Sequence, residues 1–83
     1  MNQLNHQMDG MISLIAQSLV DRPDDELVRA IEGDHTLVLE LRVAKEDVGK
    51  VIGRQGRTAQ AMRTLLGAVA SKSRRRAVLE IVE

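Results

Sequence analysis

The chain has 83 residues, 43% of them hydrophobic, and its 12 Lys and Arg balance 12 Asp and Glu, so the net charge at pH 7 is zero. This length allows one small domain with a limited core, and dimerisation would help to stabilise it. The absence of Cys excludes disulfides and thiolate metal sites, and the absence of Phe, Tyr and Trp excludes base stacking on aromatic rings. No apolar run reaches the roughly 18 residues that span a bilayer, so we expect a cytoplasmic protein without membrane insertion.

The zero net charge hides a strong asymmetry between the two halves of the chain. Residues 1–44 carry three arginines against eight acids, whereas residues 45–83 carry nine bases against four acids. Such segregation favours a protein that binds a polyanion on one side only. Chance unevenness in a small domain is the alternative.

The N-terminal part of the chain predicts a tail followed by a helix. Residues 1–7 are polar, and we expect a flexible tail before a single domain of residues 8–83. From Met8 onward, apolar residues follow the i, i+3, i+4 spacing of a helix. This helix should end near Asp21, because Pro23 disfavours helical geometry in the residue before it.

A hairpin should follow. Residues 27–32 form a weak strand, residues 33–35 a turn, and residues 36–43 a second strand in which Leu and Val alternate with other residues. Such alternation is typical of a strand with one buried face.

The second half predicts two helices and a last strand. A short helix should cover residues 45–52, a long helix residues 57–72, and a β-branched strand residues 77–82, with a basic connector before that strand. The whole order predicts an α+β fold in which the helices pack on one face of a three-stranded sheet.

The most informative motif joins the two C-terminal helices. Gly53 and Gly56 are three positions apart, Arg54 lies between them and Arg57 just after. Glycine allows backbone conformations that other residues avoid and lets a sugar-phosphate strand approach closely. With a helix starting at Arg57, we expect the amides of Gln55, Gly56 and Arg57 to be unpaired at the positive end of the helix dipole, where they would bind phosphate. An ordinary turn between helices is the alternative.

The sequence VIGRQGR at residues 51–57 resembles the VIGxxGR signature of KH domains. The element order α-β-β-α-α-β resembles the type II KH fold, and residues 41–57 resemble the short bacterial single-KH proteins of the KhpA family. The resemblance implies that the GxxG loop clamps about four nucleotides of single-stranded RNA. It further implies a non-enzymatic post-transcriptional regulator or RNA chaperone linked to cell elongation and envelope growth, acting as a homodimer or with a larger KH-containing RNA-binding protein.

The predicted RNA-binding residues lie in and around this loop. They are Gly53, Arg54, Gln55, Gly56, Arg57, Ile52, Lys50, Arg63 and Val48. Ile52 and Val48 would form the floor of a groove for bases. Simple core packing is the alternative, and it is as plausible for Val48 as the groove.

Three other features of the sequence bear on RNA binding. The run Arg74, Arg75, Arg76 is about 25 Å from the loop along the long helix, so it is either a solvated loop or a second contact for a longer RNA. Family members commonly have proline in place of Lys45 and a bulky aliphatic residue in place of Thr58. We expect Thr58 to loosen the packing behind the loop.

No other chemistry is indicated. His6 and His35 have no third ligand at metal spacing, and no nucleophile and base, Walker motif or dinucleotide fingerprint is present. We therefore expect no enzyme activity, metal or cofactor. Two alternatives to RNA binding stay open: a protein-interaction adaptor that uses the aliphatic groove or the face around Gly67, and binding of single-stranded DNA.

Overall fold

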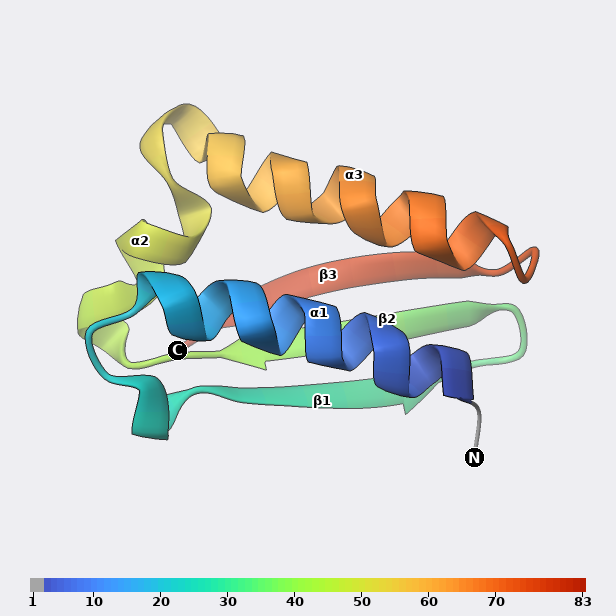
Figure 1. The fold of residues 1–83 in the computed structure, drawn as a ribbon, viewed down its shortest axis with the longest axis horizontal. Helices are drawn as coiled ribbons and strands as arrows, with labels where there is room; N and C mark the ends of the chain where they lie inside the picture. The colour runs from blue at the N-terminus through green and yellow to red at the C-terminus, as the bar shows by residue number, and fades with distance from the viewer. Residues whose placement is uncertain (1–2) are drawn as a thin grey trace.

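The computed structural model describes residues 3–83, and their side chains from residue 7 onward. It contains helices α1 (Gln3–Leu19), α2 (Val48–Ile52) and α3 (Arg57–Ser71) and strands β1 (Leu27–Glu32), β2 (Thr36–Arg42) and β3 (Arg76–Val82). Single 3₁₀ turns cover Pro23–Asp25, Lys45–Asp47 and Arg54–Gly56. The predicted α+β class and the order α-β-β-α-α-β are confirmed (Figure 1).

The sheet is mixed, with β2 in its centre. β1 pairs with β2 antiparallel and β3 pairs with β2 parallel. A parallel pair requires the chain to return to the end at which it started. The segment that contains α2 and α3 makes this return, and the turn between these two helices lies at one end of the molecule (Figure 1).

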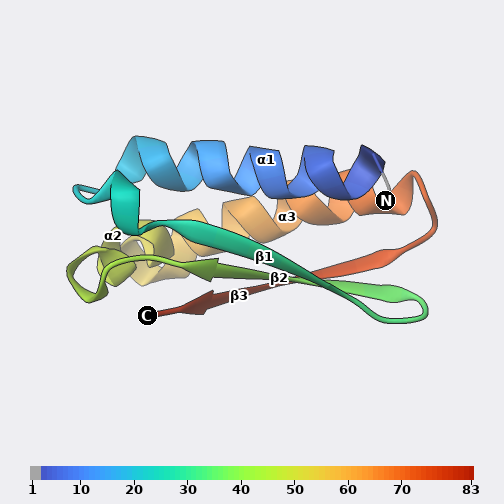
Figure 2. The same cartoon turned by 90° about the horizontal axis from the view of Figure 1, so that it is seen from below.

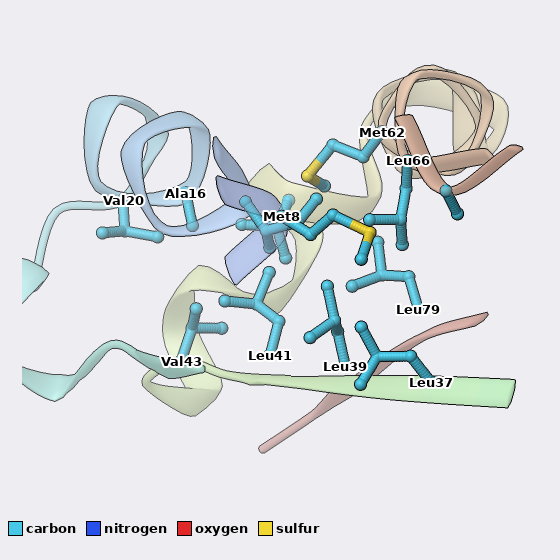
Figure 3. Packing of buried hydrophobic residues seen from close by; sticks show 13 residues of the cluster. Met8, Ala16, Val20, Leu37, Leu39, Leu41, Val43, Met62, Leu66 and Leu79 are labelled. Carbon is cyan, nitrogen blue, oxygen red and sulfur yellow. The ribbon is translucent and has the colours of Figure 1, made fainter. Parts of the chain in front are cut away.

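Helices α1 and α3 cover one face of the sheet, as predicted, and no helix of residues 3–83 covers the other face (Figure 2). Leu37, Leu39 and Leu41 alternate along β2, and their side chains are fully buried beneath the helices (Figure 3). Met8 and Met62 fill the space between the layers. Flexible methionines can fill irregular gaps, which suits a core without aromatic rings.

Helix α1 is longer than its apolar pattern predicts. It starts at Gln3, five residues before Met8, and it ends at Leu19. Its buried residues, four apart, are Met8, Ile12, Ala16 and Val20, the last of them directly after the helix. Residues 1 and 2 of the predicted tail lie outside the described residues, and the flexibility of residues 1–7 stays a prediction.

The other boundaries agree with the predictions to within a residue, with one exception. The predicted helix over residues 45–52 is divided into a 3₁₀ turn, Lys45–Asp47, and the five-residue helix α2. The division occurs at Asp47, whose side chain turns inward instead of remaining at the surface. Within residues 3–83, no helix combines the length and apolar character that crossing a membrane requires.

Candidate nucleic-acid interface

The loop between α2 and α3 has an unusual backbone. Gly53 adopts φ 80° and ψ 170°, Gln55 φ 58° and ψ 25°, and Gly56 φ 73° and ψ 12°. Three of its four residues therefore have positive φ, although Gln55 is not a glycine. A non-glycine residue in this region is uncommon and is held there by its surroundings. The loop is a defined turn that leads directly into α3.

The two glycines are needed for different reasons. A Cβ atom on Gly53 would collide with the side chain of Thr58 and lie 2.9 Å from its backbone nitrogen. A Cβ atom on Gly56 would meet nothing within 4 Å. Gly53 is therefore packed from behind by Thr58, and the looser packing expected from Thr58 in place of a bulkier residue stays a prediction. Gly56 faces open space, where a ligand has room to approach.

The hydrogen bonds of the loop correct part of the sequence-based prediction. The Gly56 N–H donates to the Gly53 carbonyl at 3.0 Å, and the Arg57 N–H donates to the Arg54 carbonyl. The prediction that these two amides are unpaired is wrong, because the 3₁₀ turn uses both of them. Among residues 3–83, the amides of Arg54 and Gln55 have no hydrogen-bond partner. Of the three amides predicted to be unpaired, that of Gln55 has no partner, and the Arg54 amide, which was not predicted, has none either.

The charges around the loop favour an anion. Helix α3 has no acidic residue in its first turn, so its positive dipole end is not neutralised there. Arg54 and Arg57 are both exposed at this end, and neither forms an ion pair with any side chain that the structure describes. Two cations beside a positive helix end repel it, and a bound phosphate would relieve this repulsion.

The two predicted groove residues differ in exposure. Ile52, directly before Gly53, is 38% exposed. Val48, one turn earlier on α2, is partly buried and packs against the core. Ile52 is therefore free to contact a base next to the loop, whereas most of Val48 is used in holding α2 to the domain.

Lys50 and Arg63 are engaged elsewhere. The Lys50 ammonium lies 3.1 Å from a carboxylate oxygen of Asp21 and 3.4 Å from one of Asp47. The Asp21 carboxylate raises the pKa of Lys50 above its ordinary value, and Asp47 adds to this effect. The Arg63 guanidinium donates a 3.3 Å hydrogen bond to the backbone carbonyl of Leu79 on β3. Neither is a free cation beside Arg54 and Arg57, and their contacts with RNA stay predictions.

The arginine run lies at the opposite end of α3 (Figure 1). Arg75 has a side chain only 17% exposed and pairs with Glu32 at 3.7 Å. The Arg76 amide donates to the carbonyl of His35 at 3.1 Å, which closes the sheet at the hairpin. The Arg75 side chain is therefore engaged within the domain, whereas the side chains of Arg74 and Arg76 are exposed. A second RNA contact at this run stays a prediction.

Asp47 is the residue whose role the sequence did not reveal. It lies within the segment predicted to be a short helix, and its side chain is completely buried. Burial raises the pKa of Asp47, yet hydrogen bonds from the amides of Asp21 and Arg22 and from Lys50 outweigh it, so the pKa is below its ordinary value. An acid next to α2 was visible in the sequence, whereas its partners about 25 residues away were not. Among the described residues, no group of three or more possible ligands could hold a metal ion.

Comparison with known proteins places this chain in a family. The family model described as KhpA/KhpB, KH domain, matches residues 10–81. The chain belongs to this family of KH domains. Three relatives share most of its length, and each is named RNA-binding protein KhpA.

These relatives come from three different bacteria. The protein of Borreliella burgdorferi is 53% identical over 88% of this chain and 89% of its own length. That of Caldanaerobacter subterraneus is 49% identical over 90% of this chain and all of its own length, and that of Chlamydia pneumoniae 47% identical over 92% and 97%. No solved structure matches the chain significantly. The matched region includes the whole turn between α2 and α3.

Proposed function

We propose that this KH domain binds single-stranded RNA through the turn from Gly53 to Gly56 and has no enzymatic activity of its own. The observation that carries the proposal is the unneutralised positive end of α3, where two amides without partners and two exposed arginines, Arg54 and Arg57, surround the turn. Backbone amides at a helix N-terminus bind phosphate well. The names of the relatives, RNA-binding protein KhpA, agree with this ligand.

The groups available at the turn can contact the phosphates of a strand more than its bases. Backbone amides and arginine side chains position a strand without reporting its sequence. The chain has no aromatic residue on which a base could stack, so the exposed side chain of Ile52 is the apolar surface beside the turn. We therefore expect low sequence discrimination, and a log-log salt dependence with a slope of about −0.7 for each phosphate contacted. Competition between matched RNA and DNA oligomers tests whether the 2′-hydroxyl contributes.

A single turn that contacts two to four phosphates, roughly the span of one KH loop, binds weakly, and linking two such modules raises the apparent affinity without new contacts. We therefore propose a cytoplasmic homodimer, or a pair with a larger KH-containing RNA-binding protein, acting in post-transcriptional control or as an RNA chaperone during cell elongation and envelope growth. Sedimentation over a range of concentrations, with and without RNA, tests the homodimer.

The adaptor function has an observation of its own. Leu65 on α3 is 49% exposed, and Ala61 and Ala68, four residues before it and three after it, are exposed as well. These positions lie on one side of the helix and form a small apolar strip. An adaptor that docks a partner through α3 would keep that partner when the turn is disabled.

The test of RNA binding is Gly56→Asp. The open space at Gly56 admits the new side chain, and Asp tolerates a left-handed backbone better than most residues. Its carboxylate would occupy the phosphate position. We expect the affinity for a short labelled single-stranded RNA, measured by fluorescence anisotropy, to be lost while the circular dichroism spectrum is unchanged.

Gly10→Asp is the matched control, because Gly10 on α1 is exposed and also has open space around it. It adds the same charge away from the turn and should leave most of the binding intact. Full affinity of Gly56→Asp would place the RNA site elsewhere. Equal losses in both variants would show that only total charge matters.

A further inference from the structure

Asp47 connects two distant parts of the chain. Among residues 7–83 it is the one charged residue that is completely buried. One of its carboxylate oxygens accepts the N–H of Asp21 at 3.1 Å, and the other accepts the N–H of Arg22 at 3.0 Å. These amides belong to the connector between α1 and β1, whereas Asp47 directly precedes α2. The carboxylate therefore fixes the connector against the start of α2.

Other charges reinforce the same junction. Lys50 lies between Asp47 and Asp21, and the guanidinium of Arg22 lies 3.1 Å from a carboxylate oxygen of Glu46. The side chains of Asp21, Arg22 and Glu46 are mostly exposed, and exposed ion pairs contribute little. The buried carboxylate is different, because its removal would leave two partly buried amides without their acceptor. Asp47 is thus the central residue of the junction.

The junction matters because of what α2 carries. This helix has only five residues, and a helix so short does not hold its shape without tertiary contacts. Its C-terminal end determines where Gly53 lies, because the Gly53 N–H donates to the Gly49 carbonyl at 2.9 Å. Within α2, Val51 is the residue that is fully buried in the core. A helix anchored at one point can roll about that point, and a second anchor at Asp47 prevents it.

We propose that Asp47 is a positioning residue for RNA binding: by fixing α2 against the α1–β1 connector, it orients the free amides of Arg54 and Gln55 toward the phosphate. Lys50 then acts as the counter-charge of Asp47 and Asp21 and not as a phosphate ligand. This inference rests on the function proposed above. It assigns a role in binding to a residue that is completely buried and cannot touch RNA.

The test compares Asp47 variants with a core variant at the other end of the sheet. Asp47→Ala removes both accepting oxygens, and Asp47→Asn keeps the shape and one of them. Leu37→Val removes one methylene from the core near the hairpin, far along β2 from α2. RNA affinity is measured at a temperature at which circular dichroism shows every variant to be folded. The chemical shifts of the Arg54 and Gln55 amides, and the hydrogen exchange of the bonded Gly53 amide, are measured by NMR without RNA.

We expect Asp47→Ala to weaken RNA binding about tenfold, the order of magnitude for mutations that act on a site without touching it, and Asp47→Asn to weaken it less. The chemical shifts of the Arg54 and Gln55 amides should change in both variants, and the Gly53 amide should exchange faster. Leu37→Val should lower the melting temperature without changing either the affinity or these amides. If Asp47→Ala does not fold, the inference is tested on Asp47→Asn alone, by its RNA affinity and by its Arg54 and Gln55 amides.

Two results would overturn the inference: folded Asp47 variants that bind RNA as the unmodified protein does, or a Leu37→Val variant that loses as much affinity as they do. The result for Gly56→Asp separates this failure from that of the proposed function. If Gly56→Asp loses RNA binding and the Asp47 variants bind normally, the positioning role of Asp47 is wrong and the proposed RNA site stands. Normal binding in Gly56→Asp removes the RNA site itself.

Discussion

The two ends of α3 are alike in their basic residues and in one feature of the backbone, and they differ in their contacts. Each end has a short basic turn with a non-glycine residue in the left-handed region, Gln55 before the helix and Arg74 after it. At the C-terminal end, Arg75 is largely buried and pairs with Glu32, and the turn is bonded to the last residues of the helix. At the N-terminal end, Arg54 and Arg57 are exposed, and two amides have no partner among residues 3–83.

The helix dipole explains why this difference matters. Cations are stabilised beside the negative C-terminal end of a helix and destabilised beside its positive N-terminal end. The arginines after α3 therefore contribute to the stability of the free domain, whereas Arg54 and Arg57 oppose it until an anion binds. Of the two basic turns, the less stable one is the candidate binding site. The number of basic residues alone would favour the other turn.

The strongest test of this comparison removes two arginines from each end. In Arg54→Gln/Arg57→Gln we expect RNA affinity to fall roughly 10- to 100-fold for each arginine that contacts phosphate, the range for removing one charged hydrogen bond. The salt slope should decrease in magnitude by about 0.7 for each phosphate that the variant no longer binds. Anisotropy titrations at several salt concentrations measure both quantities.

Arg74→Gln/Arg76→Gln is the matched control for that experiment. It removes the same charge from two exposed arginines at the other end of α3, and we expect little change in affinity or salt slope. Equal losses at the two ends would mean that RNA follows the whole helix, and the distinction between the turns would fail.

A second prediction concerns the glycines that allow the N-terminal turn. Gly53→Ala should cost about 2–3 kcal/mol, because φ 80° with ψ 170° is accessible essentially only to glycine and Thr58 occupies the Cβ position. Gly56→Ala should cost only about 1–2 kcal/mol, since its Cβ would meet open space. Thermal unfolding should separate the two variants by several degrees, at about 4–8 °C per kcal/mol for a domain of this size. Identical melting temperatures would contradict the described contact with Thr58.

Much of the fold follows from local patterns. The alternation of apolar and other residues along β2 predicted that Leu37, Leu39 and Leu41 share one buried face. Their burial beneath the helices confirms this prediction. The spacing of apolar residues likewise predicted α3, and the two glycines between the helices predicted the turn. These signals depend on neighbours in the sequence, so they are readable without the structure.

The details of the site depend on backbone conformation and on distant contacts, and residue type and spacing did not reveal them. Whether the amides of Gly56 and Arg57 are free is decided by the left-handed backbone of Gln55, which closes a 3₁₀ turn. Whether Lys50 is free is decided by Asp21, on a connector far away in the sequence. Residue type and spacing indicate that a cation is present, and the tertiary arrangement decides whether it is already neutralised.

The smallest expected effect comes from relieving the left-handed residue at each end. In Arg74→Gly and Gln55→Gly, glycine removes the steric cost of positive φ but loses more conformational entropy on folding. We therefore expect the free energy of unfolding of each variant to rise by less than about 1 kcal/mol. The two variants should differ in their effect on RNA affinity. Gln55→Gly makes the binding turn more flexible and should weaken binding slightly, whereas Arg74→Gly should not. Denaturant unfolding measures the stability of both variants, and anisotropy measures their RNA affinity on the same samples. Weaker binding by Arg74→Gly alone would show that the C-terminal turn belongs to the RNA site.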